Sequence, residues 1–256
     1  MIDFSKKKLG KMMPKYYPRT LRMDKYLTSS LPPPPPYRAW SKAIHFPCGE
    51  MMNDQIGDCT IAAVGHGVQV LTANTGSEVT IQDPDIEVAY EAVGGYKPSD
   101  PSTDNGCALL DVLNYWRKTG IGGHHILAYM RVSPLNLAHV QTAIEYFGGL
   151  YIGIGLPQSA QAQIGGVWDV PQGGVTGAGA LYSWGGHGVW MPDYDECGFN
   201  VITWGERQRM TLAFQQTYND ESFAVVTQDF INKSTQANPN GLNLALLQQD
   251  LAQVTG

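Results

Sequence analysis

Residues 53–69 read NDQIGDCTIAAVGHGVQ, an irregular segment that runs into an apolar one. The apolar residues of the second part recur at helical spacing, namely Ile61, Ala62, Val64, Val68 and Leu71. This spacing predicts a helix from about Asp58 to Ala73, with Asp58 as its cap. Cys59 therefore lies at a helix start, either as a small core thiol or as a nucleophile whose pKa the helix dipole and unpaired N–H groups lower.

A nucleophilic thiol needs a proton partner, which is most often a histidine. The chain has 6 histidines. His66 lies on the Cys59 helix, about 10 Å further along by helix rise, and cannot reach the thiol. His187 opens a predicted strand after the sequence SWGG, where small neighbours leave an imidazole free to face a cleft. The alternative is that His187 is satisfied by backbone groups at a sheet edge.

An oxyanion that forms at the thiol needs hydrogen-bond donors. The backbone N–H of Cys59 is one candidate. The side-chain amides of Asn53 and Gln55 are two more, because the loop before the helix could bring either back over the thiol. For Asn53, an equally good interpretation is a turn-forming or capping residue.

The remaining pattern predicts an α+β fold, with an N-terminal helical lobe packed on a C-terminal antiparallel sheet or barrel lobe. Helical patterns cover residues 85–93, the amphipathic stretch CALLDVLNYWRKTGI from Cys107, and residues 135–146. Strand patterns cover residues 150–156, two segments joined by a turn at residues 195–198, and residues 221–230. A site between the lobes would take residues from both halves.

Composition and charge exclude several classes of function. The 256 residues carry a net charge of −6 with a pI near 5.4, which does not favour nucleic-acid binding. No segment resembles a signal peptide or approaches the length of a membrane span. The 4 cysteines form no CxxC pair, so we expect no metal site and no cofactor, but free thiols in a reducing compartment, cytoplasmic or virion-associated.

We divide the chain into an extended, basic, proline-rich arm (residues 1–46), a main domain (residues 47–230) and a linker with a short helical tail (residues 231–256). Basic residues cluster at the start of the arm, which is either a solvated terminus or a contact for an acidic partner. The prolines at 32–36 predict polyproline II. Tyr37 and Trp40 beside them favour a strap that lies on the protein's own surface.

Residues 53–63 (NDQIGDCTIAA) and, much later, residues 185–205 (GGHGVWMPDYDECGFNVITWG) together resemble the papain-like cysteine protease superfamily, in a divergent bacterial or phage-type form. The separation of Cys59 from His187, 187 − 59 = 128 residues, is close to the roughly 130–150 of that family. The resemblance covers about residues 47–228. It implies that Cys59 is the nucleophile and His187 the general base.

The same resemblance places Asn53 on the family's oxyanion-hole glutamine, whereas Gln55 has the right side chain two positions late. The sequence departs from the family pattern at the position of the asparagine that would orient His187. Ile202 stands there, and its side chain donates no hydrogen bond. Thr203 could take that role if a one-residue shift brings its hydroxyl to His187.

Two functions follow from the resemblance. The favoured one is a cysteine peptidase or related thiol acyl-transfer hydrolase that acts on a peptide or protein. The alternative, which Ile202 and the long arm suggest, is a catalytically weak or inactive papain-fold structural or binding protein. As an assembly or virion-associated component, it would dock to a protein partner or a second copy through residues 1–40.

Overall fold

The structure is a computed structural model that describes residues 3, 6–18, 20–25 and 32–230. Its α-helices are α1 (Cys59–Ala73), α2 (Asp83–Gly94), α3 (Leu109–Lys118), α4 (Leu137–Phe147) and α5 (Leu212–Tyr218). Its strands are β1 (Leu21–Arg22), β2 (Arg38–Ala39), β3 (Ile126–Val132), β4 (Leu150–Leu156), β5 (Val167–Trp168), β6 (Gly185–Asp195), β7 (Gly198–Thr203), β8 (Glu206–Thr211) and β9 (Asn219–Thr227). Short 3-10 helices are η2 (Met23–Lys25), η3 (Trp40–Ala43), η4 (Pro101–Thr103), η5 (Gln158–Gln163), η6 (Gly177–Gly179) and η7 (Gln228–Phe230).

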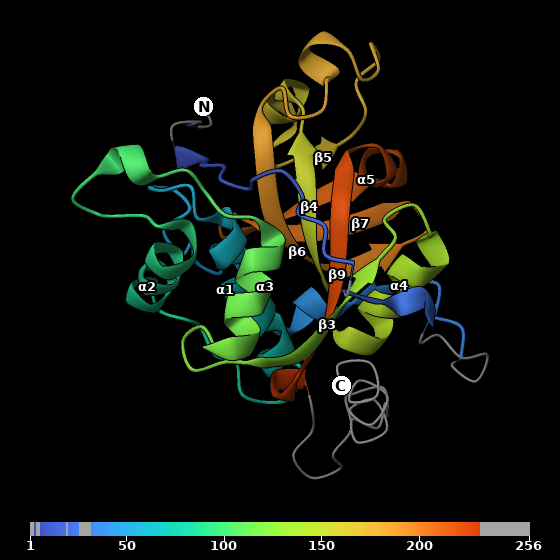
Figure 1. The fold of residues 1–256 in the computed structure, drawn as a ribbon. Coiled ribbons are helices and arrows are strands. Elements are labelled where there is room, and N and C mark those ends of the chain that lie inside the picture. Colours follow the sequence, from blue (N-terminus) through green and yellow to red (C-terminus); the bar gives the residue numbers. More distant parts are fainter. Residues whose placement is uncertain (1–2, 4–5, 19, 26–31, 231–256) are drawn as a thin grey trace.

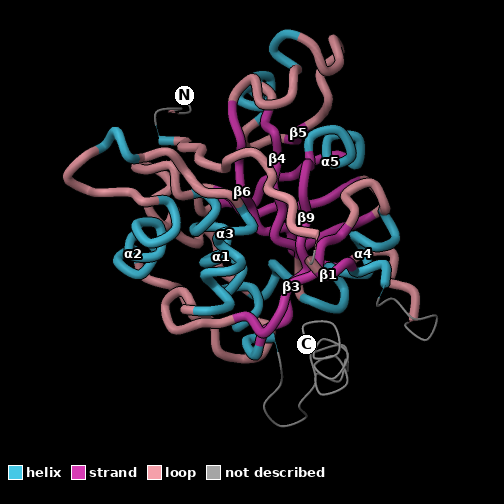
Figure 2. The backbone as a smooth tube through the Cα atoms, viewed as in Figure 1, coloured by secondary structure: helices cyan, strands magenta, loops and turns pink. Residues whose placement is uncertain are grey.

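Helices α1, α2 and α3 pack together beside one large sheet, with α1 against β6 (Figure 1). The strands follow the order β1-β3-β9-β4-β6-β7-β8-β5, and β2 pairs with β6. All pairings are antiparallel except β1 with β3 and β5 with β8. The predicted α+β architecture, helices first and a mostly antiparallel sheet after them, is confirmed (Figure 2).

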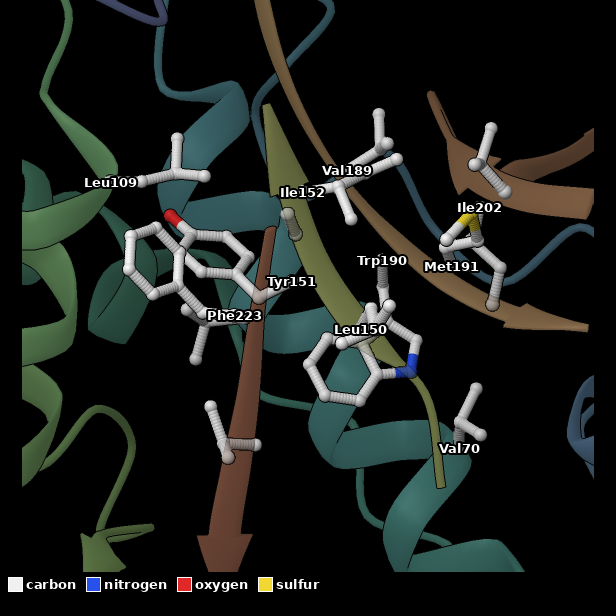
Figure 3. Close-up of a cluster of buried hydrophobic side chains, with 14 of the residues drawn as sticks. Val70, Leu109, Leu150, Tyr151, Ile152, Val189, Trp190, Met191, Ile202 and Phe223 are labelled. Carbon is white, nitrogen blue, oxygen red and sulfur yellow. The ribbon is translucent and has the colours of Figure 1, made fainter. Parts of the chain in front are cut away.

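Helix α1 forms the centre of this arrangement, because all but its last residue are buried. It approaches the sheet closely where it lacks side chains: a Cβ atom added at Gly67 would lie 2.8 Å from the Trp190 ring. Trp190 and Leu150 lie beside Val70 of the helix in the core (Figure 3). This close packing fixes the helix, and with it Cys59, against the strand that contains His187.

Two elements depart from the predicted division into a helical half and a strand half. Strand β3 lies in the first half, and its alternation of buried and exposed residues is hidden in the sequence because exposed Leu127 is also apolar. Helix α5 lies in the second half, where Thr211 caps it by accepting from the Phe214 N–H at 3.0 Å. The predicted tail helix near residues 244–251 lies outside the described residues.

The proline run lies against the domain, as the strap interpretation predicts. The Tyr194 hydroxyl donates to the Pro35 carbonyl at 2.9 Å, and Trp40 is buried. Tyr37 differs from the prediction because its side chain is 63% exposed.

Among the described helices, none is both long and apolar enough to cross a membrane.

Candidate active site

Cys59 is the first residue of α1, directly after the loop of residues 53–58. The N–H groups of a first helical turn have no acceptor within the helix, so they can stabilise a negative charge. Asp58 occupies the cap position, but its side chain makes no capping hydrogen bond. It accepts instead from the Asn53 amide at 3.1 Å, an interaction that closes the loop upon itself.

The two amides proposed for an oxyanion hole lie differently. Asn53 is buried, and its Nδ2 donates to the Ile56 carbonyl at 3.2 Å as well as to Asp58. Both amide hydrogens are therefore used within the loop, which is the arrangement of a turn-forming residue. Gln55 is exposed. Across the described residues, no hydrogen bond joins either side chain to the Cys59 sulfur.

His187 lies on β6, between β4 and β7, and is fully buried. Its Nε2 atom is 2.6 Å from the Thr203 hydroxyl, at the end of β7. Ile202, the residue before Thr203, is buried in the apolar core (Figure 3). Successive residues of a strand face opposite sides, so Thr203 rather than Ile202 reaches the imidazole. The Thr203 hydroxyl is thus placed against His187, as the one-residue shift requires.

Trp204 covers one face of the His187 imidazole. The two rings stack with centroids 4.5 Å apart at an angle of 20°. Thr203 pairs with Glu206, so Trp204 and Gly205 form a two-residue turn, with φ of 48° and 74°. Positive φ at both positions is what a type I′ hairpin turn requires. This tight turn positions the indole against His187.

The thiol and the imidazole come from elements that touch. Gly188, the residue after His187, donates its N–H to the Cys59 sulfur at 3.3 Å. A Cβ atom added at Gly188 would lie 3.0 Å from the Thr60 Cα, so the approach depends on glycine. The second imidazole nitrogen, Nδ1, is buried and has no hydrogen-bond partner in the described part of the chain.

Several solved structures are similar to this chain in overall fold. Xylellain, a cysteine protease from Xylella fastidiosa, has a TM-score of 0.63 at 14% identity, over 89% of this chain and 99% of its own. A Carica candamarcensis cysteine protease in complex with E-64 has a TM-score of 0.53 at 14% identity, over 75% of this chain and 98% of its own. Digestive procathepsin L 3 of Tenebrio molitor has a TM-score of 0.55 at 12% identity, over 87% of this chain and 77% of its own.

The chain has the papain-like fold. At these identities the match is one of architecture. No family model matches the sequence, and no curated protein matches it.

In this papain-like chain the N-terminal arm crosses the Cys59 region. We call residues 8–12 the covering segment. The Gly10 N–H hydrogen-bonds the Cys59 sulfur, and the Gly10 carbonyl accepts from Cys107 N–H at 2.8 Å. On the other side, the Lys11 N–H donates to the Gly186 carbonyl at 3.0 Å. The segment thus lies between residues 106–107 and β6, and it leaves Cys59 only 1% exposed.

Burial under the covering segment corrects the expectation of a lowered thiol pKa. Loss of water raises the pKa of Cys59 to about 12, against which the hydrogen bonds from Gly188 and Gly10 act only in part. Burial likewise lowers the pKa of His187 to about 3. A helix start favours the thiolate, but desolvation opposes it more strongly here. In this closed form both groups are neutral.

The sequence does not predict the covering segment as part of the site. One signal was available in Gly10, the only glycine of the first 46 residues, within a run of basic and large side chains. A Cβ atom there would lie 1.6 Å from the Gly57 carbonyl oxygen.

The described residues contain no group of three or more His, Cys, Asp or Glu side chains that could hold a metal ion.

Proposed function

We propose that this chain is a cysteine peptidase, or a related thiol acyl-transfer hydrolase, that uses a Cys59–His187 dyad. The observation that supports it most is the hydrogen bond from Gly188 to the Cys59 sulfur, because it holds the thiol against the strand that contains His187. A peptide or protein is the proposed substrate, since an extended stretch of the chain's own backbone already lies at the thiol.

In the proposed reaction, the Cys59 thiol passes its proton to His187 Nδ1 while the sulfur attacks the scissile carbonyl carbon. The Nδ1 atom is available because Nε2 is engaged by Thr203. The leaving amine then takes that proton from the imidazolium, and water hydrolyses the thioester. The Cys59 N–H supplies one oxyanion donor, whereas Asn53 or Gln55 would have to leave its present position to supply a second.

The closed form described above would be latent. A substrate can reach the thiol only after the covering segment has left, and the same departure would rehydrate the dyad and allow thiolate and imidazolium to form. We therefore propose that displacement of residues 8–12 switches the enzyme on.

The alternative, a structural or binding protein that docks through residues 1–40, stays a prediction. The described part of that stretch contacts the chain's own domain at Asn53, Cys107 and Gly186, which does not favour a role as a free docking arm. We also propose a reducing compartment, cytoplasmic or virion-associated. The free state of Cys48, Cys59, Cys107 and Cys197 supports this proposal.

The test uses Gly10→Val in the full chain, because a side chain at Gly10 collides with the Gly57 carbonyl and expels the covering segment. We expect this variant to hydrolyse an unfolded protein such as casein, and the Gly10→Val/Cys59→Ala variant to leave it intact. Iodoacetamide should label Cys59 of Gly10→Val well below pH 9, in a Cys197→Ala background that removes the exposed thiol. A Gly10→Val chain that is labelled readily at Cys59 but hydrolyses nothing would refute the peptidase.

A further inference from the structure

The side chain of Lys11 enters a closed site next to the thiol. Lys11 follows Gly10, whose N–H bonds the Cys59 sulfur, and its own N–H is held by Gly186. From there the side chain turns inward, and none of it is exposed to solvent. A lysine side chain is rarely buried to this extent unless a carboxylate receives it.

Two carboxyl groups of β9 receive the Lys11 amine. Its Nζ atom lies 2.8 Å from Asp220 Oδ2 and 3.3 Å from Glu221 Oε1. The Tyr182 hydroxyl, 3.3 Å from Nζ, also donates to Asp220. We call Asp220, Glu221, Tyr182 and Gly153 the Lys11 site.

The Lys11 site has more acceptors than one amine can fill. Glu221 is 1% exposed, and its Oε1 has no hydrogen-bond partner within the described residues, so the ion pair with Lys11 is its main compensation. Asp220 Oδ1 is also buried without a hydrogen-bond partner among them. A buried, unsatisfied carboxylate oxygen is costly, and a guanidinium with five donors would satisfy more of these atoms than lysine does.

The site also depends on a missing side chain. A Cβ atom added at Gly153 of β4 would lie 2.0 Å from Lys11 Cε. Gly153 lies in the middle of a fully buried strand, where a glycine weakens the strand and often marks the close approach of another group. Here the approaching group is the lysine side chain.

We propose that the Lys11 site is a substrate-selecting site, which binds a lysine or arginine side chain of the peptide that replaces the covering segment. The inference rests on the proposed peptidase function. The hydrogen bonds of residues 10–12 to Cys107 and Gly186 join backbone atoms, so any extended peptide can form them. Backbone pairing supplies affinity in this mode, and the side-chain sites supply specificity. Lys11 is thus the chain's own stand-in for the basic residue of a substrate.

The first test measures cleavage. The full-length Gly10→Val chain is given a random peptide library, and the cleaved bonds are mapped by mass spectrometry. We expect lysine and arginine to be enriched about tenfold at one fixed position relative to the cleaved bond. The enrichment should fall below about threefold in Asp220→Asn/Glu221→Gln, added to the same background. Cleavage without enrichment, or enrichment that survives the double substitution, overturns the proposal.

A binding test separates this proposal from the peptidase itself. Fluorescein-labelled peptides KKLGKMM, which repeats residues 7–13, and KKLGMMM are titrated into full-length Gly10→Val/Lys11→Ala/Cys59→Ala. We expect the lysine peptide to bind at least about tenfold more tightly than its methionine counterpart. No preference for lysine overturns the selecting site, whether or not peptides are cleaved. A clear preference without any cleavage by the Cys59-containing chain leaves the selecting site standing and removes the peptidase.

A second variant guards against misfolding of the double substitution. Gly153→Ala fills the Lys11 site without changing its charge, and should abolish the preference for the lysine peptide in the same background. Its control is Gly173→Ala, because a Cβ atom at Gly173 meets nothing within 4 Å. Equal lysine preference in Gly153→Ala and Gly173→Ala also overturns the proposal.

Discussion

Two groups of buried polar side chains lie under the covering segment, and they differ in the charged partners that they have. Cys59 and His187 have no ion-pair partner in the described residues. Loss of water raises the pKa of the thiol to about 12, although the Lys11 charge acts against it, and lowers that of the imidazole to about 3. In the Lys11 site, one amine meets two carboxyl groups at 2.8 and 3.3 Å. A charged partner opposes the effect of burial without cancelling it, since the pKa of Glu221 beside Lys11 is still raised to about 7.

The difference assigns two tasks to one short segment. At the dyad, the covering segment keeps reactive groups neutral and out of reach. At the Lys11 site, the covering segment contributes a basic side chain, which is the kind of side chain that we propose the site to bind. Four substitutions or titrations separate these tasks.

The dyad should respond most strongly to loss of its base. In the Gly10→Val background, His187→Ala should lower kcat for peptide hydrolysis by about 10⁵- to 10⁶-fold, because a nucleophile and its base act as one unit. Single-turnover kinetics measure the effect. His139→Ala, which removes a partly exposed histidine of α4, is the matched control and should leave hydrolysis unchanged. Similar losses in both variants would contradict the assignment of His187.

The Lys11 site should respond next, through stability. Lys11→Met leaves Asp220 and Glu221 without their cation and should lower the free energy of unfolding by about 3 kcal/mol, as expected for one partner of a buried pair. Urea titration measures it. The control is Lys15→Met, since Lys15 makes a half-exposed ion pair with Asp111 at 2.6 Å and should change stability by less than about 1 kcal/mol. Equal values would show that the Lys11 pair contributes no more than a surface pair.

Thr203→Val tests the hydroxyl that stands in for the missing asparagine. In the Gly10→Val background it should lower kcat by about tenfold to a hundredfold with little change in KM, because it removes one hydrogen bond to an imidazole that becomes charged during the reaction. Thr203→Ser keeps the hydroxyl and should restore most of the rate. A Thr203→Val variant with unchanged kcat would show that the stacking of Trp204 alone orients the ring.

The smallest effect is expected from pH at the Lys11 site. Burial raises the pKa of Glu221 to about 7, despite the opposing charges of Lys11 and Arg131 and with support from Asp220. This pKa applies with a lysine amine in place, because the amine itself lowers it. The ionised carboxylate attracts a basic side chain and the neutral acid does not, so the attraction declines as the pH falls toward 7. The preference for KKLGKMM over KKLGMMM should therefore weaken about threefold between pH 8 and pH 6. Glu221→Gln should make the ratio independent of pH in this range, and a parallel decline in that variant would assign the titration elsewhere.

Much of the fold could be predicted from local pattern. The segment from Asp58 to Ala73 has helical periodicity and forms α1, and β4 covers residues 150–156, as predicted. Strand β3 was missed because its exposed Leu127 masks the alternation, and such exposure is decided by which neighbours cover a residue.

The candidate site, like the fold, has features that the sequence predicts and features that it does not. The position of Cys59 at a helix start and that of His187 near a strand start were predictable from the sequence, because helix starts and strand starts have local signatures. The use of the Asn53 amide within its own loop was not, since nothing in the residue types distinguishes a turn amide from an oxyanion donor. Nor was the thiol pKa, which depends on what covers Cys59.

By itself, the sequence determined a helix that begins at a cysteine, a strand that begins near a histidine, and the α+β architecture that joins them, because these features depend on periodicity and on capping and turn residues. The position of Gly10 on the thiol and the meeting of Lys11 with Asp220 and Glu221, at sequence separations of 209 and 210 (220 − 11 and 221 − 11), depend on the tertiary fold. Contacts of that kind depend on a glycine at the right point of two distant segments and on the water that their meeting removes. Both are properties of the folded chain and leave no local pattern.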